Sequence, residues 1–223
     1  MPFITKLINS QSVVDNTYVW EFEKPAGFDF AAGQYTNLTL INPTQDDPVA
    51  NCRFFSMASA PAEKTLLFAA RSTESAFNAG FRALRPGEMV ELSRPAGNFV
   101  IEHGPQTIVF FVGGIGIAPV RGILKQLEFE GRDIDIKIFY SNTSLNRALW
   151  QADIENWYSH VELITLISDD GQRLSDDIIS QQAGQADMYY TVGKPEFVRY
   201  TLRSMQGVGI PLERVRMEQF TPY

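Results

Sequence analysis

The sequence is poor in the side chains that hold inorganic cofactors. Among its 223 residues it has one cysteine, Cys52, and two histidines, His103 and His160. A single cysteine excludes an intrachain disulfide and an iron–sulfur cluster held by four thiolates. So few nitrogen and sulfur ligands also argue against a zinc site. No metal centre is expected, so any redox chemistry would have to come from a bound organic cofactor.

Long apolar runs and an excess of basic charge are also missing. The most apolar stretch, residues 107–120, contains three glycines and is shorter than the roughly 20 residues that a membrane-spanning helix needs. The first residues do not resemble a secretory signal. Lys and Arg number 19 against 26 Asp and Glu, a net charge of −7, which disfavours general binding to phosphate backbones. We expect a cytoplasmic protein with no membrane or nucleic-acid partner.

The sequence does contain two halves that differ in their predicted pattern of secondary structure. Residues 3–100 form short alternating segments separated by Pro and Gly, which is typical of an antiparallel barrel or sandwich. Strands are predicted there at residues 17–23, 35–40, 66–70 and 89–92, with one helix over 75–84. From residue 107 strands and helices alternate, which predicts a parallel sheet covered by helices. Its strands are expected at 107–112, 134–140, 161–167, 188–192 and 214–220, and its helices at 119–130, 148–158, 176–182 and 195–207.

The polar segment at residues 102–106, which contains Gly104 and Pro105, marks the predicted domain boundary. We therefore predict an N-terminal antiparallel β-barrel over residues 1–103. A C-terminal α/β domain with a parallel sheet is predicted over residues 104–223.

A glycine-rich loop follows the first strand predicted in the second domain. It contains Gly113, Gly114, Ile115 and Gly116, and the helix that follows begins near Pro119. Glycines let a ligand approach the backbone, and the N–H groups of a helix start favour phosphate. The loop is neither the usual dinucleotide fingerprint, because Pro119 stands where a third glycine would be, nor a P-loop. The alternative is a tight strand-to-helix turn without a ligand.

The residues at the end of the next predicted strand bear on whether the coenzyme is NADP or NAD. It contains Ser141 and Asn142, which carry no charge, and Arg147 follows close by. An acidic residue for a ribose 2′-hydroxyl is expected about 20 positions after the glycines. Asp133 and Asp135 have that spacing, but they stand at the start of the strand instead of its end. The strand end does not repel a 2′-phosphate, which favours NADP over NAD.

A second candidate is the segment Arg53-Phe54-Phe55-Ser56. In a strand, Arg53 and Phe55 share one face, and Phe54 and Ser56 share the other. Ser75 precedes a predicted helix, which it can cap, and the turn there can accept a pyrophosphate. The alternative is a barrel strand whose phenylalanines belong to the core.

These segments belong to a longer series that resembles one family. In order, the series is Gly33-Gln34-Tyr35, Arg53-Phe54-Phe55-Ser56, Pro95-Ala96-Gly97-Asn98-Phe99, Gly113 to Pro119, Val192-Gly193-Lys194-Pro195 and Glu218-Gln219-Phe220-Thr221-Pro222-Tyr223. Order and spacing resemble those of the ferredoxin-NADP(+) reductase superfamily over nearly the whole chain. The resemblance implies an FAD-binding barrel followed by an NAD(P)-binding domain.

In the barrel, the resemblance implies that Arg53 contacts the flavin phosphates and that Phe55 packs on the isoalloxazine. The family usually has Tyr at the position of Phe55, so a hydroxyl is lost. Ser56 would lie near flavin N5. The other flavin contacts implied are Phe54, Phe68, Ala70, Arg71, Ser75 and Ala76.

In the second domain, the resemblance implies that the glycine loop cradles the pyrophosphate of NADPH or NADH. Gly193, Lys194 and Pro195 would lie near the nicotinamide, with Val192 where the family often has Cys. Glu218 matches an acidic residue close to that ring. Tyr223 matches a terminal aromatic residue that covers the flavin, and Pro222 replaces a commoner glycine. The residues in the nucleotide site are Gly113, Gly114, Ile115, Gly116, Pro119, Ser141, Asn142, Arg147, Gly193, Lys194 and Pro195.

The function implied is hydride transfer from NADPH or NADH to bound FAD, followed by release of single electrons to a separate acceptor, with ferredoxin or flavodoxin expected. Ser56, Glu218 and Tyr223 are the expected catalytic residues. An acidic partner would need a basic docking surface, which Arg82, Arg85, Arg94, Arg121, Lys125, Arg199 and Arg203 would form if they gather in space. Two alternatives stay open: a flavin reductase that releases reduced flavin, and a non-catalytic electron-transfer subunit.

Overall fold

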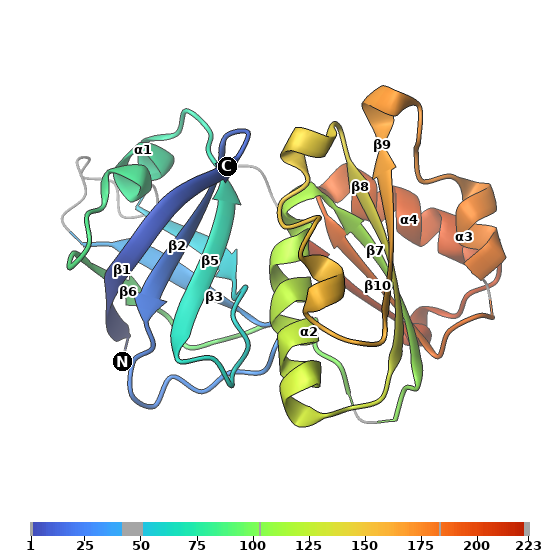
Figure 1. The fold of residues 1–223 in the computed structure, drawn as a ribbon, viewed down its shortest axis with the longest axis horizontal. Helices are drawn as coiled ribbons and strands as arrows, with labels where there is room; N and C mark the ends of the chain where they lie inside the picture. The colour runs from blue at the N-terminus through green and yellow to red at the C-terminus, as the bar shows by residue number, and fades with distance from the viewer. Residues whose placement is uncertain (1, 42–50, 103, 183, 221–223) are drawn as a thin grey trace. The chain divides into compact units, whose positions relative to one another are not determined.

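The computed structural model describes residues 2–41, 51–102, 104–182 and 184–220. The chain divides into two compact units (Figure 1). The barrel unit consists of Met1–Val100 with Ala118–Gln126, and the sheet unit consists of Ile101–Ile117 with Leu127–Tyr223. The predicted domain boundary between residues 103 and 104 stays a prediction.

The barrel unit is built on a six-stranded antiparallel sheet in the order β4-β3-β6-β1-β2-β5. The strands are β1 Phe3–Val14, β2 Thr17–Glu23, β3 Tyr35–Leu40, β4 Cys52–Ser56, β5 Thr65–Arg71 and β6 Met89–Leu92. The N–H of Ala58, just after β4, donates to the carbonyl of Leu67 in β5 over 2.8 Å. This bond links the two ends of the strand order, as in a barrel.

Aromatic rings fill the core of the barrel unit. The helix α1 (Ala76–Ala83) contributes Phe77 and Phe81, which are 1% and 0% exposed. Phe81 stacks on Trp20 with ring centroids 4.1 Å apart, and its carbonyl accepts from the Trp20 indole N–H over 3.2 Å. Since full burial of one such side chain stabilises the fold by about 1.5–3 kcal/mol, this cluster is a main source of stability.

The sheet unit contains five parallel strands in the order β11-β10-β7-β8-β9. The strands are β7 Thr107–Gly113, β8 Asp135–Asn142, β9 Val161–Ile167, β10 Met188–Gly193 and β11 Val215–Gln219. The 3-10 turns are η1 Gly114–Gly116, η2 Leu145–Arg147, η3 Ile154–Asn156, η4 Ser168–Asp170 and η5 Leu212–Arg214. Residues Ile108–Val112 of β7 are all buried, which explains why that strand is apolar without alternation.

The α-helices described after α1 are α2 Ile117–Glu130, α3 Asp176–Gln182 and α4 Pro195–Gly207. Helices α3 and α4 cover one face of the parallel sheet (Figure 1), where Ile179 and Met205 join a buried cluster with Val109 and Phe111. In the part of the chain that the structure describes, no helix is long and apolar enough to cross a membrane.

One carboxylate ties the start of β7 to the segment before β10. Oδ2 of Asp187 accepts hydrogen bonds from the N–H groups of Gln106 and Thr107, at 2.8 and 3.0 Å, and from the Thr107 hydroxyl at 3.1 Å. These donors, chiefly the backbone N–H groups, lower the pKa of Asp187. Neighbouring strands of the sheet are thereby joined at their amino ends.

The predicted fold class is confirmed: an antiparallel barrel-like sheet precedes a parallel α/β sheet. The helix predicted over residues 148–158 is wrong. The chain there makes turns and the single 3-10 turn η3, and Trp150 has a left-handed φ of 58° that a helix does not allow. Its apolar residues, such as Leu149 and Ile154, are nevertheless buried, and the Tyr158 hydroxyl accepts from the N–H of Ile134 over 2.8 Å.

Candidate flavin and nucleotide sites

The register of the parallel strands gathers predicted site residues at one edge of the sheet. Gly113, the last residue of β7, stands opposite Ser141 of β8. Val192 of β10 stands opposite Glu218 of β11, and Gly193 is the last residue of β10. These residues therefore lie at the carboxyl ends of four neighbouring parallel strands. Open α/β sheets bind ligands at this edge.

The glycine turn after β7 is packed closely against β10. Gly114 has a φ of 54° and begins η1, and α2 starts at Ile117 with the buried Pro119 in its first turn. A Cβ added to Gly116 would lie 2.8 Å from the carbonyl oxygen of Val192. Gly116 is therefore required by packing of backbone against backbone, apart from any ligand. Ile115 is half-buried in the same turn.

The turn after β10 lies beside the glycine turn. Gly193 has a φ of 153°, and a Cβ there would lie 3.1 Å from Cα of Gly113. The Gly193 carbonyl accepts from the N–H of Phe220 over 2.8 Å, which holds the segment that follows β11. Lys194 is exposed, and Pro195 occupies the first position of α4, where its missing N–H costs nothing.

The end of β8 is polar and carries no carboxylate. Asn142 is 7% exposed, and Ser141 is half-buried. Within the residues described, the buried Ser141 hydroxyl oxygen has no hydrogen-bond partner. Arg147 is half-buried at the end of η2. This combination of a hydroxyl, an amide and a guanidinium suits an anionic ligand.

In the barrel unit, Arg53 lies beside the start of α1. Its guanidinium carbon is 5.2 Å from the centroid of the Phe77 ring, in the first turn of that helix. Ser75 caps the helix by accepting from the N–H of Asn78 over 3.3 Å, and both Ser75 and Ala76 are half-buried. A cation next to a helix start fits a diphosphate, so the phosphate end of FAD matches the residues present.

The two phenylalanines of β4 have opposite surroundings. Phe55 is 7% exposed, and its ring centroid lies 5.2 Å from Phe81 and 5.9 Å from Phe68. Phe54 is 58% exposed and meets the Tyr35 ring edge-on at 5.4 Å. A flavin contact at Phe55 would require its ring to leave these core neighbours. Its role in stacking therefore stays a prediction that the geometry does not favour.

The other predicted flavin residues are spread along the barrel. Ser56 is 7% exposed at the end of β4, and Phe68 is fully buried in β5. Ala70 and Arg71 are half-buried at the end of β5. Glu218 is half-buried on β11, in the sheet unit. Tyr223 lies outside the described residues, so its predicted place over the flavin is not described.

Two motifs of the resemblance contact each other. Tyr35 and Ala96 exchange backbone hydrogen bonds of 2.9 and 2.8 Å, and the Gln34 side-chain amide donates to the carbonyl of Gly97 over 3.2 Å. A Cβ at Gly33, where φ is 94°, would overlap the carbonyl oxygen of Phe99. These two motifs therefore pack against each other within the barrel unit. This contact explains their presence in the sequence without a ligand.

Sequence reasoning missed Phe197. This residue of α4 lies against both Gly113 and Gly193. A lone aromatic at the start of a predicted helix is not distinguished from an ordinary core residue by its pattern. A signal was nevertheless available, because Phe197 stands only two residues after Pro195, the last residue of the Val192–Pro195 motif.

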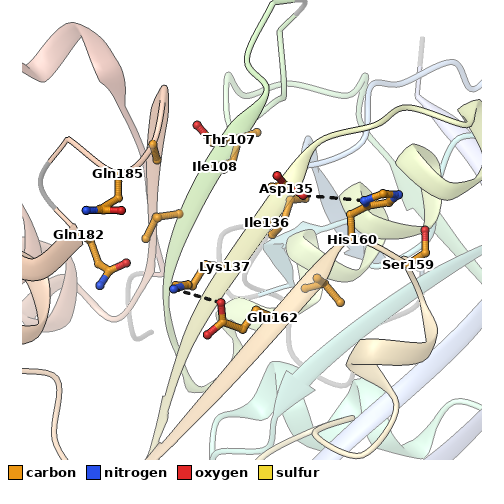
Figure 2. Close-up of a pocket in the computed structure, with 13 residues that line it drawn as sticks. Thr107, Ile108, Asp135, Ile136, Lys137, Ser159, His160, Glu162, Gln182 and Gln185 are labelled. Atoms are coloured by element: carbon orange, nitrogen blue, oxygen red, sulfur yellow. Dashed lines mark ion pairs between the residues drawn. The ribbon is translucent and has the colours of Figure 1, made fainter.

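A hollow of about 510 Å³ lies at the opposite, amino-terminal edge of the sheet, among the first residues of β7, β8 and β9 (Figure 2). Two contacts join polar groups there. Lys137 Nζ is 3.0 Å from a Glu162 oxygen, and His160 Nδ1 is 3.8 Å from an oxygen of Asp135 and 3.3 Å from one of Asp133, which is not a lining residue. No predicted site residue lines it, so it is separate from the candidate nucleotide site of the same unit. In the described ranges, no three His, Cys, Asp or Glu side chains are grouped to hold a metal ion.

Comparison with known proteins identifies the fold. No family model matches the chain. It is 24% identical over 211 residues to a flavohemoprotein of Candida albicans, which covers 86% of this chain and 51% of that protein. It is 29% identical over 143 residues to an NADPH oxidoreductase of Mycobacterium tuberculosis, covering 60% and 37%. The chain spans about half the length, or less, of the curated relatives it matches.

Among solved structures, a ferredoxin NADP+ reductase of Neisseria gonorrhoeae with bound FAD and NADP superposes with a TM-score of 0.84 at 17% identity, covering 97% of each chain. The flavohem-like FAD/NAD-binding domain of a Vibrio cholerae nitric oxide dioxygenase gives 0.79 at 17% identity, covering 99% of each. The resemblance inferred from the motifs is confirmed: the chain has the two-domain fold of the ferredoxin-NADP(+) reductase superfamily.

Proposed function

We propose that this chain is an NAD(P)H-dependent flavoprotein reductase that holds FAD in the barrel unit and the nicotinamide nucleotide at the carboxyl edge of the parallel sheet. The observation that carries the proposal is the alignment of Gly113, Ser141, Gly193 and Glu218 on four neighbouring strand ends. The relatives named as NADPH oxidoreductase and ferredoxin NADP+ reductase support the same chemistry.

Bound FAD would supply the redox chemistry, accepting a hydride from the nicotinamide and passing electrons on singly. Arg53 and the start of α1 would bind its diphosphate. The Ser56 hydroxyl would donate a hydrogen bond near flavin N5. Glu218 would orient the nicotinamide, and Tyr223 would cover the flavin until the nucleotide arrives. Residues 1–103 and 104–223 would be the flavin and nucleotide domains.

We further propose NADPH as the preferred donor. The end of β8 offers the Ser141 hydroxyl and the Arg147 guanidinium, and residues 141–147 contain no Asp or Glu. A 2′-phosphate is stabilised by such donors, whereas a carboxylate for a free 2′-hydroxyl is missing.

The acceptor is proposed to be a separate protein, ferredoxin or flavodoxin, with a cytoplasmic location as the composition predicts. The basic surface predicted for it is reduced in the structure, because Arg121 is bound to Glu63 and Arg199 is paired with Glu196. Exposed Arg82, Arg85 and Arg94 of the barrel unit still support docking of an acidic partner. The names of the relatives cover several acceptor systems. A flavin reductase and a non-catalytic subunit are therefore kept as alternatives.

Reduction under anaerobic conditions tests the proposal. The purified protein should be yellow, and NADPH should bleach the flavin absorbance faster than NADH. The reduced protein is then offered ferredoxin, flavodoxin or free FMN. Fast transfer to either protein supports the proposed acceptor, and turnover with free FMN alone supports a flavin reductase. Protein that takes up no FAD on reconstitution would refute the proposal.

A further inference from the structure

The two backbone turns of the proposed nucleotide site share one side chain as their support. We infer that Phe197 is a positioning residue for that site, and that Gly113 lacks a side chain because the Phe197 ring occupies the space. The inference rests on the proposed function. It explains the glycine at position 113 by packing against Phe197 and not by the approach of a phosphate.

At Gly113 the available space, and not the backbone conformation, requires a glycine. Gly113 has φ −104° and ψ 112°, an extended conformation that any residue adopts. Backbone strain therefore does not demand glycine there. A Cβ at this position would instead lie 3.0 Å from Cγ, 3.1 Å from Cδ1 and 3.4 Å from Cδ2 of Phe197. The nearest atoms are all in one aromatic ring.

The same ring also limits Gly193. A Cβ there would lie 3.2 Å from Cδ1 of Phe197 and 3.2 Å from the carbonyl oxygen of Gly113. The turn after β7 and the turn after β10 therefore touch each other, and Phe197 contacts both. A shift of this ring would move both sets of backbone amides together.

The helix that carries Phe197 is linked to β10 by a buried hydrogen bond. The hydroxyls of Thr191 in β10 and Thr201 in α4 are 2.6 Å apart, and both residues are fully buried. Thr201 also bonds the carbonyl of Val198 over 3.0 Å. Since α4 is tied to β10 in this way, the helix that carries the ring cannot easily move away from an added methyl group.

A double-mutant cycle tests the inference on the FAD-reconstituted protein. The variants are Gly113→Ala, Phe197→Ala and the double variant, and the readouts are the dissociation constant for NADP+ and the unfolding midpoint. Gly113→Ala should weaken NADP+ binding about tenfold, because it displaces the turn. The double variant should bind at least about threefold more tightly than Gly113→Ala, because the methyl group then has room.

Two controls make the result specific. Phe197→Leu retains Cγ, the atom nearest to the added methyl, so Leu at this position should not rescue Gly113→Ala. Leu202→Ala removes a partly buried side chain of the same helix that packs in the same cluster. That variant should lower the unfolding midpoint but should not change the effect of Gly113→Ala on NADP+ affinity.

The outcomes are distinct. If the double variant binds as weakly as the product of the single effects, Gly113 serves ligand approach and the inference is wrong. If the two substitutions are coupled in the unfolding midpoint but not in NADP+ affinity, Phe197 has only a structural role. That result would also overturn the inference. If the unaltered protein binds neither NADP+ nor NAD+, the proposed function fails, and the nucleotide role of Phe197 fails with it. Coupling in the midpoint would then still show the packing.

Discussion

The barrel unit and the sheet unit build their candidate sites in different ways. In the barrel, the predicted contacts are side chains such as Arg53 and Ser75, and they stand on a core of stacked aromatic rings. In the sheet, the predicted contacts are mostly backbone groups of Gly113, Gly116 and Gly193, where a side chain would meet a neighbour. An antiparallel barrel presents alternating side chains, whereas parallel strands end together and present their turns.

This difference indicates how each site should fail. Truncating a side chain should damage the barrel site, either through its core or through lost charge. Adding a side chain should damage the sheet site, because its turns are in contact with other backbone. The following experiments test that comparison, from the largest expected effect to the smallest.

Truncation in the barrel core should have the largest effect. Phe81→Ala should lower the free energy of unfolding by about 3–5 kcal/mol, because it leaves a cavity among Trp20, Phe55 and Phe77. Urea denaturation measures this. Phe54→Ala is the matched control, since that ring is 58% exposed and its loss should cost under about 1 kcal/mol. Equal losses in both variants would contradict the packing described.

Loss of the barrel cation should weaken cofactor binding more than stability. Arg53→Met should weaken FAD binding by about 1.5–3 kcal/mol, roughly tenfold to a hundredfold, because a charged hydrogen bond to phosphate disappears. FAD titration of the apoprotein measures this. Arg94→Met removes an exposed arginine of the same unit as control. Unchanged FAD affinity in Arg53→Met would remove Arg53 from the site.

Adding a methyl group in the sheet turn should cost less than the core truncation. Gly116→Ala should destabilise the protein by about 1–3 kcal/mol, because its Cβ would lie 2.8 Å from the backbone oxygen of Val192. Gly207→Ala is the control, since no atom lies within 4 Å of that added Cβ. Alanine in this helix position should be neutral or should stabilise by about 0.4–1 kcal/mol. A Gly116→Ala variant as stable as the parent protein would show that the turn relaxes.

The smallest effect concerns an ion pair of the barrel unit and depends on pH. Both terminal guanidinium nitrogens of Arg121 donate hydrogen bonds of 2.9 Å to the Glu63 carboxylate. Burial would raise the pKa of Glu63, but the Arg121 hydrogen bonds and charge outweigh it and hold the pKa below the ordinary 4.5. Because the folded pKa is lowered, the stabilisation is present above pH 4.5 and is lost as pH falls through the folded value.

Glu63→Gln tests this pair. The variant should lose about 0.5–1 kcal/mol at pH 7, a value reduced because the carboxylate is 28% exposed and screened by solvent. The difference from the parent protein should shrink at pH 3. Arg121→Met should remove the same pH-dependent part. A difference that is constant from pH 7 to pH 3 would show that the ion pair contributes nothing.

Periodicity alone predicted much of the fold. The strands at 17–23, 35–40, 89–92 and 161–167 and the helices at 176–182 and 195–207 agree with the structure residue for residue. Each is bounded by turn residues and presents one clear apolar pattern. The helix predicted at 148–158 failed because tertiary contacts hold this segment, and spacing does not show them. The Leu149 carbonyl accepts from the Tyr140 hydroxyl of β8, and the Tyr158 hydroxyl accepts from the N–H of Ile134.

By itself the sequence determined the two-domain fold and the positions of the turns that carry the candidate sites. Alternating apolar residues, glycines and prolines determine the local backbone structure. Strands and turns can therefore be predicted from them without knowledge of the tertiary contacts. Only the tertiary structure decided which β4 phenylalanine faces the core and why the glycines stand where they do. Phe55 is buried by rings from β5 and α1, and Gly116 is confined by β10. These partners are distant along the chain, and contact between distant residues is a property of packing.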